Sequence, residues 1–126
     1  MKKIIWFLKQ LLLLRFTIEL RRINPKVDLI KTLILIYFNK LSREVYRNKK
    51  GSRKREIVYI RYLTAYFLNI HTRLSLAEIG KAIGKYDHST INWAKEQIDN
   101  WSQTDKSVRD DIEKIEQIIN KKLLGL

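Results

Sequence analysis

The sequence predicts an all-α protein: a compact helical bundle that contains a helix-turn-helix and carries an extra N-terminal helix. Proline occurs once and glycine four times in 126 residues, so few positions interrupt a helix. Apolar residues recur at helical spacing in several stretches, and none shows the alternation that is typical of strands. We expect a helical extension over residues 1–24 and one domain over residues 25–126, because this length suits a single core.

Residues 2–22 are predicted to form the N-terminal helix. The segment is apolar nearly all round between Ile4 and Leu14, and its charges do not gather on one face. This favours a helix that packs on the rest of the chain or on a second copy. The alternative is a helix lying on an anionic membrane surface, with its basic residues at the lipid headgroups. A signal peptide is not indicated, because Lys9 and Arg15 interrupt the apolar run.

A second helix is expected after Asn24-Pro25, because proline suits the first turn of a helix. Its apolar stripe should face the core and consists of Ile30, Leu33, Ile34, Tyr37 and Leu41. Residues 42–52 are predicted to form a loop. From Arg53 to about His71 we expect a long helix that is apolar over most of its circumference, and therefore buried as the central helix.

The next stretch predicts two helices joined by a short turn. Ser75 and Glu78 have the spacing of a capping box, so a short helix should begin at Leu76. Gly84 can take a positive φ and is expected to end that helix. Asp87 is a good N-cap for the following helix, whose buried face should be Ile91, Ala94, Ile98 and Trp101. This order is typical of a helix-turn-helix.

A last helix is expected to begin with Ser107 as its cap. Its buried stripe should consist of Val108, Ile112, Ile115, Ile119 and Leu123. Its outer face is acidic and should point to solvent, away from any phosphate backbone, with Asp110, Asp111, Glu113 and Glu116.

The net charge of +13 lies entirely in the first half of the chain. Residues 1–63 hold 17 Lys and Arg against 4 Asp and Glu, whereas residues 64–126 hold 9 of each kind. A polyanion is the indicated partner, nucleic acid first and an anionic membrane surface second. The chain has no cysteine, which excludes disulfides and thiolate zinc sites and favours a reducing compartment. The longest uncharged run, 62–72, is too short to cross a bilayer.

No catalytic apparatus is predicted. The sequence lacks the G-x-x-x-x-G-K-[ST] loop that cradles nucleotide phosphates, and it lacks G-x-S-x-G. Its two histidines show no metal-ligand spacing. We therefore expect no enzyme activity, no cofactor and no metal site.

Residues 84–91, G-K-Y-D-H-S-T-I, resemble the signature G-G-R-D-H-[ST]-T-V of the bacterial replication initiator DnaA family. The resemblance runs without a gap from Gly51 to about Ile119. Its other matching positions are Lys54-Arg55, Ile57-Val58, Arg61, Ala65 to Leu68, Thr72, Ser75-Leu76 and Glu78 to Gly80. It implies the helical DNA-binding domain of that family, without the ATPase module, which reads a short duplex site called the DnaA box.

Two groups of residues are expected to contact bases. A basic stretch, residues 47–55, contains Arg47, Lys49, Lys50, Arg53, Lys54 and Arg55. The resemblance implies that Arg53, with Arg55 close behind, enters the minor groove. A narrow minor groove has a strongly negative electrostatic potential, which attracts arginine. It also assigns major-groove reading to Asp87, His88 and Ser89. A carboxylate accepts from a cytosine amino group, and an imidazole donates to guanine. The alternatives are that Asp87 is only an N-cap and that His88 is only solvated.

Phosphate contacts are expected from Lys54, Arg61, Lys81, Thr90 and the backbone N–H of Leu76. The chain also departs from the family pattern. Lys85 and Tyr86 replace a glycine and an arginine, Tyr62 replaces a common glutamine, and Trp93 replaces a common histidine. These departures put the matching phosphate contacts in question and allow a different site preference.

The sequence thus predicts specific binding of double-stranded DNA at DnaA-box-like sites, regulating replication initiation or transcription in the cytoplasm at the nucleoid. Two alternatives stay open. One is a membrane-surface protein driven by residues 1–23 and the basic first half. The other is a protein-interaction module that keeps the fold without reading DNA, with residues 2–22 as the surface for a second copy or a protein partner.

Overall fold

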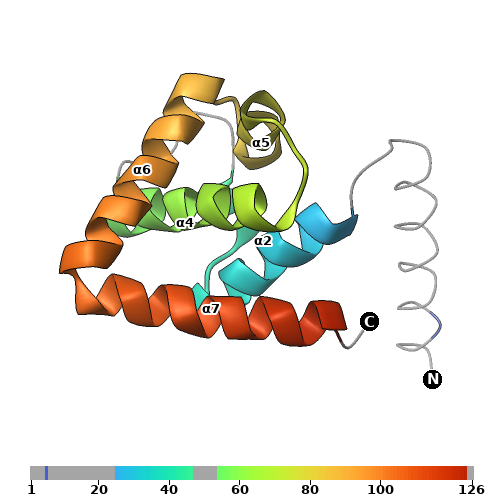
Figure 1. Cartoon of the computed structure of the whole chain (residues 1–126). Coiled ribbons are helices and arrows are strands. Elements are labelled where there is room, and N and C mark those ends of the chain that lie inside the picture. The colour runs from blue at the N-terminus through green and yellow to red at the C-terminus, as the bar shows by residue number, and fades with distance from the viewer. Residues whose placement is uncertain (1–4, 6–24, 47–53, 125–126) are drawn as a thin grey trace.

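The computed structural model describes Ile5, residues 25–46 and residues 54–124 (Figure 1). Every regular element in these ranges is a helix, which confirms the all-α class. In chain order the elements are α2 (Pro25–Phe38), α3 (Ser42–Val45), α4 (Arg55–His71), α5 (Leu76–Ile83), α6 (His88–Thr104) and α7 (Lys106–Leu124). Apart from Ile5, the helix predicted over residues 2–22 lies outside the described residues, as do residues 47–53 of the basic stretch, so the division at residue 24 stays a prediction.

Helix α4 is the central helix of the bundle, as predicted. Helices α2, α3, α5 and α6 all pack against it, while α7 closes the lower edge in Figure 1 by packing on α2 and α6. Its inner side chains are completely buried, with Ile60, Leu63, Thr64, Ala65, Phe67 and Leu68 all at 0% exposure. Burial of each large apolar side chain contributes about 1.5–3 kcal/mol, so this helix supplies much of the core.

The apolar stripe of α2 is shorter than predicted. Ile30, Leu33 and Ile34 are buried, but Leu41 is 52% exposed and lies beyond the end of the helix. Asn39 takes a left-handed conformation with φ of 54°, which asparagine tolerates, and this residue ends the helix. The prediction that Leu41 continues the core stripe is therefore wrong, because the backbone turns before reaching it.

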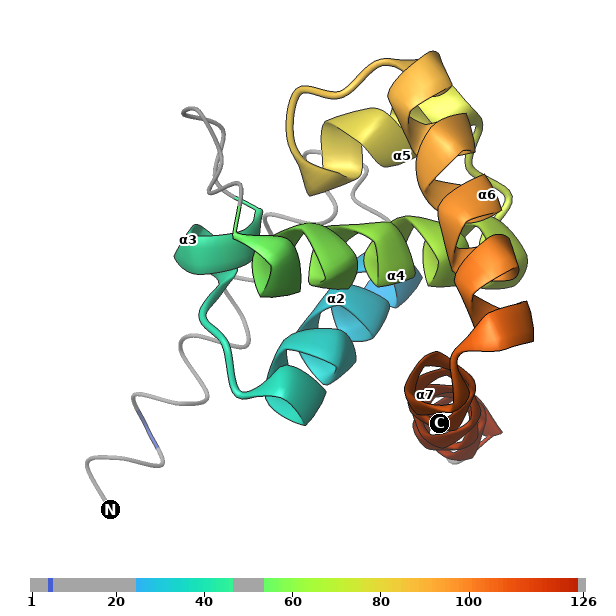
Figure 2. The same cartoon turned by 90° about the vertical axis from the view of Figure 1, so that its left-hand side faces the viewer.

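The predicted loop over residues 42–52 begins with the short helix α3, so the loop prediction is wrong for residues 42–45. Figure 2 shows α3 beside the first turns of α4. Val45 and Tyr46 follow its exposed residues and are buried in the core. This single turn is too short to show helical periodicity, which is why the sequence pattern did not predict it.

Two predicted helix starts need correction. Helix α4 begins at Arg55, not at Arg53, with Lys54 as its N-terminal flanking residue. Helix α7 is capped by Asp105, not by Ser107. The Asp105 carboxylate accepts from the Ser107 backbone N–H at 2.9 Å and from the Ser107 hydroxyl at 2.7 Å. Helix α6 continues to Thr104, so Asp105 is the one residue between the two helices and becomes the cap.

The predicted acidic outer face of α7 is only partly solvent-facing. Asp111 points inward, and its two carboxylate oxygens accept from the hydroxyls of Tyr37 and Tyr59, each at 2.8 Å. Burial and the Asp111 carboxylate raise the pKa of Tyr37 to about 12, so the hydroxyl stays a donor. Glu116 is also partly buried, with Oε1 2.8 Å from His71 Nε2. These contacts fasten α7 to α2 and α4.

The two helices of the predicted helix-turn-helix are confirmed, with Ser75 and Asp87 as their N-caps. Gly84 ends α5 as predicted, but its φ of 173° is extended backbone, so the predicted positive φ is wrong. The essential glycine is Gly80, inside α5. A Cβ atom at this position would lie 2.0 Å from the Tyr86 carbonyl oxygen and 3.5 Å from Ile91 Cγ1. The turn into α6 therefore requires a residue without a side chain at position 80.

We predict that Gly80→Ala destabilises the protein by about 1–3 kcal/mol, the usual cost of overpacking. Alanine is intrinsically better in a helix by roughly 0.5–1 kcal/mol, but that gain is smaller than the cost of displacing a backbone carbonyl. Urea unfolding would measure the difference. Gly84→Ala is the control, since its extended backbone accepts a side chain. Equal stability losses in the two variants would contradict this explanation.

We also predict a loss of stability in acid that is caused by the helix caps. Hydrogen bonds to N-terminal helix groups lower the pKa values of Glu78, Asp87 and Asp105 below their ordinary values of 4.5, 3.8 and 3.8. The unfolded chain then binds more protons, so the stabilisation is complete above the ordinary values and is lost as the pH falls through the folded ones. Thermal unfolding from pH 6 to pH 2 would measure this. Asp105→Asn should flatten the profile, and an unchanged profile would contradict the prediction.

Candidate nucleic-acid interface

The first turn of α6 presents polar side chains at a helix N-terminus. The Asp87 carboxylate accepts from the Thr90 backbone N–H at 2.8 Å, which fixes where the helix begins. Asp87, His88, Ser89 and Thr90 are all exposed. The N-cap alternative for Asp87 is therefore confirmed as a structural role. The carboxylate still lies on the surface, beside His88 and Ser89, so capping does not exclude a base contact.

Helix α5 supplies two of the predicted phosphate contacts. Its capping box is formed as predicted, because Ser75 Oγ accepts from the Glu78 N–H and Glu78 Oε1 accepts from the Ser75 N–H, both at 3.1 Å. Leu76 is the first residue of the helix, where backbone N–H groups have no carbonyl partner within the helix. Lys81 is exposed in the last turn. The two groups thus lie at opposite ends of α5.

Arg61 has a structural role that the sequence did not indicate. Its side chain is only 9% exposed, and its Nε donates to the Val45 carbonyl oxygen at 2.6 Å. This hydrogen bond attaches the end of α3 to α4. Arg61 and Thr90 also line the same small hollow, of about 140 Å³, between α4 and α6. The structure therefore brings two of the predicted phosphate ligands together, although they are 29 positions apart in the sequence.

The basic stretch is described only at its end. Arg53, the predicted minor-groove residue, lies outside the described residues. Lys54 and Arg55 are exposed where α4 begins. A helix N-terminus carries partial positive charge, which the two cations increase. This end of α4 is therefore a favourable place for an anion such as a phosphate.

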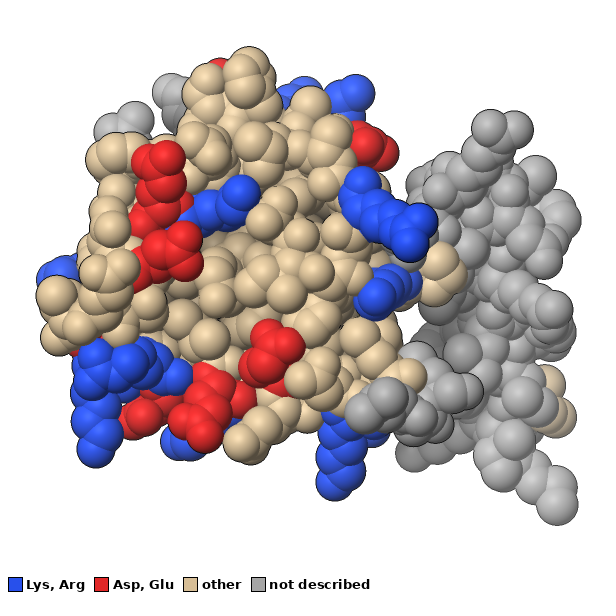
Figure 3. Space-filling model, viewed as in Figure 1, with Lys and Arg blue, Asp and Glu red and all other residues tan. Residues whose placement is uncertain are grey.

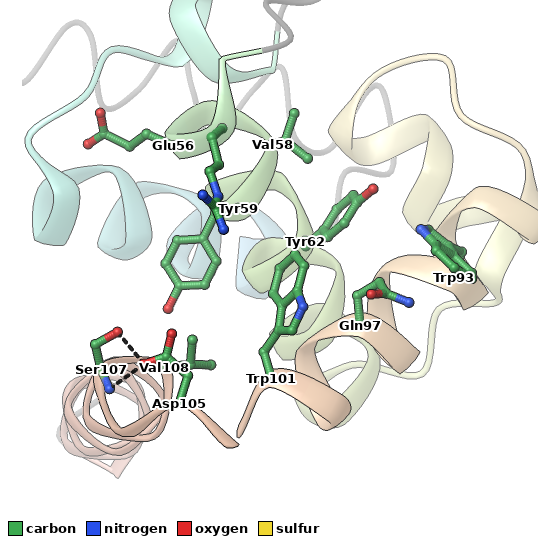
Figure 4. A pocket seen from close by; sticks show the side chains of 11 residues that line it. Glu56, Val58, Tyr59, Tyr62, Trp93, Gln97, Trp101, Asp105, Ser107 and Val108 are labelled. Atoms are coloured by element: carbon green, nitrogen blue, oxygen red, sulfur yellow. Dashed lines mark hydrogen bonds between the residues drawn. The ribbon is translucent and has the colours of Figure 1, made fainter. Parts of the chain in front are cut away.

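An aromatic hollow of about 910 Å³ lies between α4, α6 and the start of α7 (Figure 4). Its aromatic walls are formed by Tyr59, Tyr62, Trp93 and Trp101. The Tyr62 and Trp101 rings are stacked with centroids 5.9 Å apart, and Trp93 is 55% exposed. Two residues that depart from the family pattern, Tyr62 and Trp93, are thus brought to one surface. Their spacing in the sequence carries no signal of this, since they belong to different helices.

Tyr86 is the third aromatic residue that departs from the family pattern, and it lies in the small hollow rather than in the aromatic one. Tyr62 and Tyr86 both line the small hollow that contains Arg61 and Thr90, whereas Lys85 is exposed in the turn. Tyr62 therefore belongs to both hollows and connects the first turn of α6 to the aromatic hollow.

Negative charge limits where a polyanion can approach. Figure 3 shows acidic side chains over α6 and along α7, with basic side chains among them. The acidic residues of these two helices include Glu96, Asp99, Asp110, Glu113 and Glu116. Within α6 the acidic residues Glu96 and Asp99 lie beyond the first two turns, where their carboxylates would repel phosphates, so the polar first turn is the part of this helix that suits DNA.

Across residues 25–46 and 54–124, no helix is long and apolar enough to span a membrane. The same ranges hold no group of three or more His, Asp and Glu side chains that could bind a metal ion.

Comparison with known proteins identifies the family. A family model described as the bacterial DnaA protein helix-turn-helix matches residues 27–98, more than half of the chain. The match extends the resemblance, first noted from Gly51, back to α2.

Individual proteins that resemble this chain belong to the same family. The chain is 39% identical over 97 residues to the chromosomal replication initiator protein DnaA of Flavobacterium psychrophilum, which covers 77% of this chain and 19% of that protein. It is 39% identical over 71 residues to DnaA of Bacteroides fragilis, covering 56% of this chain and 15% of the relative. For DnaA of Borrelia hermsii the identity is 34% over 96 residues, with 76% and 19% covered. The chain spans less than a fifth of these relatives, and it belongs to the DnaA helix-turn-helix family.

Proposed function

We propose that this chain binds double-stranded DNA at sites of the DnaA-box type, and so acts in replication initiation or in transcription. The observation that carries the proposal is the capped, exposed D-H-S-T turn at the start of α6, held in a helix-turn-helix of the DnaA family. In helix-turn-helix proteins the second helix enters the major groove with its N-terminal residues at the base edges. The printed names of the relatives, chromosomal replication initiators, support the link to replication.

The proposed base contacts come from two places. In the major groove, Asp87 accepts from a cytosine amino group, His88 donates to guanine, and Ser89 donates or accepts. In the minor groove, the proposed contacts are Arg53 and Arg55 of the basic stretch. The Asp87 carboxylate has a second role, because it also caps α6. Its position is thereby fixed, which favours a defined contact.

The proposed phosphate contacts surround these bases and set the register of the protein on DNA. They are Lys54, Arg61, Lys81, Thr90 and the N–H of Leu76. Arg61 and Thr90 share the small hollow beside the first turn of α6, and the Thr90 N–H is already used by the cap, which leaves its hydroxyl. Arg61 donates its Nε to the Val45 carbonyl oxygen, so this nitrogen is not available to a phosphate.

The same proposal covers the other aspects of the function. A helix-turn-helix domain of this kind is not itself catalytic, and the site requires no cofactor. A role on DNA places the protein in the cytoplasm at the nucleoid. The membrane-surface and protein-interaction alternatives are not favoured, because the family match covers the DNA-reading helices. A second copy or protein partner at residues 2–22 stays a proposal.

We predict tighter binding to a labelled duplex carrying a DnaA box than to a scrambled duplex, by about tenfold or more. Fluorescence anisotropy across a salt series would measure both affinities. The logarithm of affinity should fall with the logarithm of salt by roughly 0.9 per phosphate neutralised. The double variant Asp87→Ala, His88→Ala should lose the preference and keep the slope. Equal binding of both duplexes by the wild type would contradict the proposed function.

The two roles of Asp87 can be separated by a second set of variants. Asp87→Ser keeps an N-cap oxygen, so its thermal unfolding midpoint should stay near that of the wild type. It loses the carboxylate, so its preference for the box should fall by about fivefold or more, the effect of one lost base contact. Asp87→Ala should lose both properties. If Asp87→Ser binds the box like the wild type, Asp87 is a cap and does not read a base.

A further inference from the structure

Lys31, on α2, joins two elements that are far from it in the sequence. Its Nζ donates to the Ala82 carbonyl oxygen in the last turn of α5, at 2.6 Å. The same Nζ lies 4.9 Å from the centroid of the Tyr46 ring, directly after α3. One ammonium group thus contacts the end of α5 and the end of α3 at once.

The contact with Ala82 has a consequence for the reading helix. The last carbonyl groups of a helix have no partner within it and carry partial negative charge, so a cation there is stabilising. Gly80, two residues earlier, has its carbonyl occupied by the Gly84 N–H at 3.0 Å. Only the short turn over residues 84–87 separates this end of α5 from the first residue of α6. A shift of the α5 end is therefore passed to α6.

Tyr46 is held firmly enough to act as the second anchor. Thr64 donates its hydroxyl proton to the Ile60 carbonyl at 2.8 Å, so the 2.6 Å contact between the two hydroxyls has Tyr46 as donor. The preceding residue, Val45, accepts from Arg61 Nε at 2.6 Å. Both bonds attach the end of α3 to α4. The Tyr46 ring is 8% exposed and presents its face to Lys31.

The chemistry of the contact requires a cation. A methionine could fill the same space without the desolvation of an ammonium group. It could neither donate to a carbonyl oxygen nor bind the face of an aromatic ring. Burial lowers the pKa of Lys31 while the Asp28 carboxylate opposes that shift, so the group is partly removed from water. Electrostatic contacts are stronger in such surroundings than at an exposed surface.

We propose that Lys31 is a positioning residue for DNA reading: its ammonium group fixes the end of α5, and with it the first turn of α6, relative to α3 and α4. The role in DNA recognition rests on the proposed function above. The positioning itself does not, and it can be measured without DNA.

The first experiment measures the position of α6 directly. The chain has no cysteine, so Arg43→Cys on α3 and Asn92→Cys on α6, both exposed, allow two spin labels. Double electron–electron resonance then gives the distribution of distances between them. Lys31→Met should broaden or shift this distribution, and Lys31→Arg, which keeps the cation, should restore most of it. The exposed Lys114→Met on α7 is the matched control and should change nothing.

The second experiment uses the same Lys31 and Lys114 variants without labels, on the box and scrambled duplexes. Lys31→Met should reduce the box preference by about fivefold, within the range of known long-range couplings, and leave the salt slope unchanged. Lys31→Arg should recover it. If Lys31→Met only lowers the unfolding midpoint, and leaves the distance distribution and the box preference as in the wild type, the proposal is overturned. A wild type without box preference would contradict the proposed function, while the distance distribution would still decide whether Lys31 positions α6.

Discussion

The turn between α5 and α6 passes so close to α5 that the Tyr86 carbonyl oxygen occupies the space where a side chain at position 80 would begin. This close approach lets the Gly80 carbonyl accept from both the Gly84 N–H at 3.0 Å and the Tyr86 N–H at 3.5 Å. It also brings Ile91, in the first turn of α6, onto the backbone of α5. The angle at which the D-H-S-T turn leaves the bundle depends on it, because a larger residue at position 80 would push the turn outward.

Polar side chains around this contact fix the relative positions of the helices more closely than apolar packing alone would. Arg61 attaches the end of α3 to α4, Lys31 connects α2 with the ends of α3 and α5, and Asp111 attaches α7 to α2 and α4. Each of these groups is at least partly buried, where a lost partner would cost more than an exposed one. Directional hydrogen bonds specify one arrangement, whereas apolar contacts tolerate small displacements.

Two side chains of the aromatic hollow depart from the family pattern. Tyr62 and Trp93 replace residues that are commonly glutamine and histidine, and the fold places both on the surface next to the first turn of α6. Rings that are large and apolar contact sugars and thymine methyl groups more readily than they bind phosphates. If α6 reads DNA as proposed, this exchange changes the chemistry beside its first turn while the D-H-S-T turn is kept, and related domains can share a scaffold and differ in function in this way.

The sequence by itself determined the features that depend on near neighbours in the chain. These are the helical class, the caps at Ser75 and Asp87, the buried stripe of α4 and the motif that shows the family, because each is decided by residues within one or two turns. The tertiary structure decided the inward position of Asp111, the burial of Arg61, the exposure of Leu41 and the need for glycine at position 80. The choice of Asp105 over Ser107 as the cap was also open in the sequence, since both are good N-caps and only the length of α6 selects one. The exposure of Leu41 follows from the turn at Asn39, and the cap at Asp105 follows from the length of α6. In the other cases the deciding atom belongs to another segment of the chain, and its position is set by the packing of whole helices.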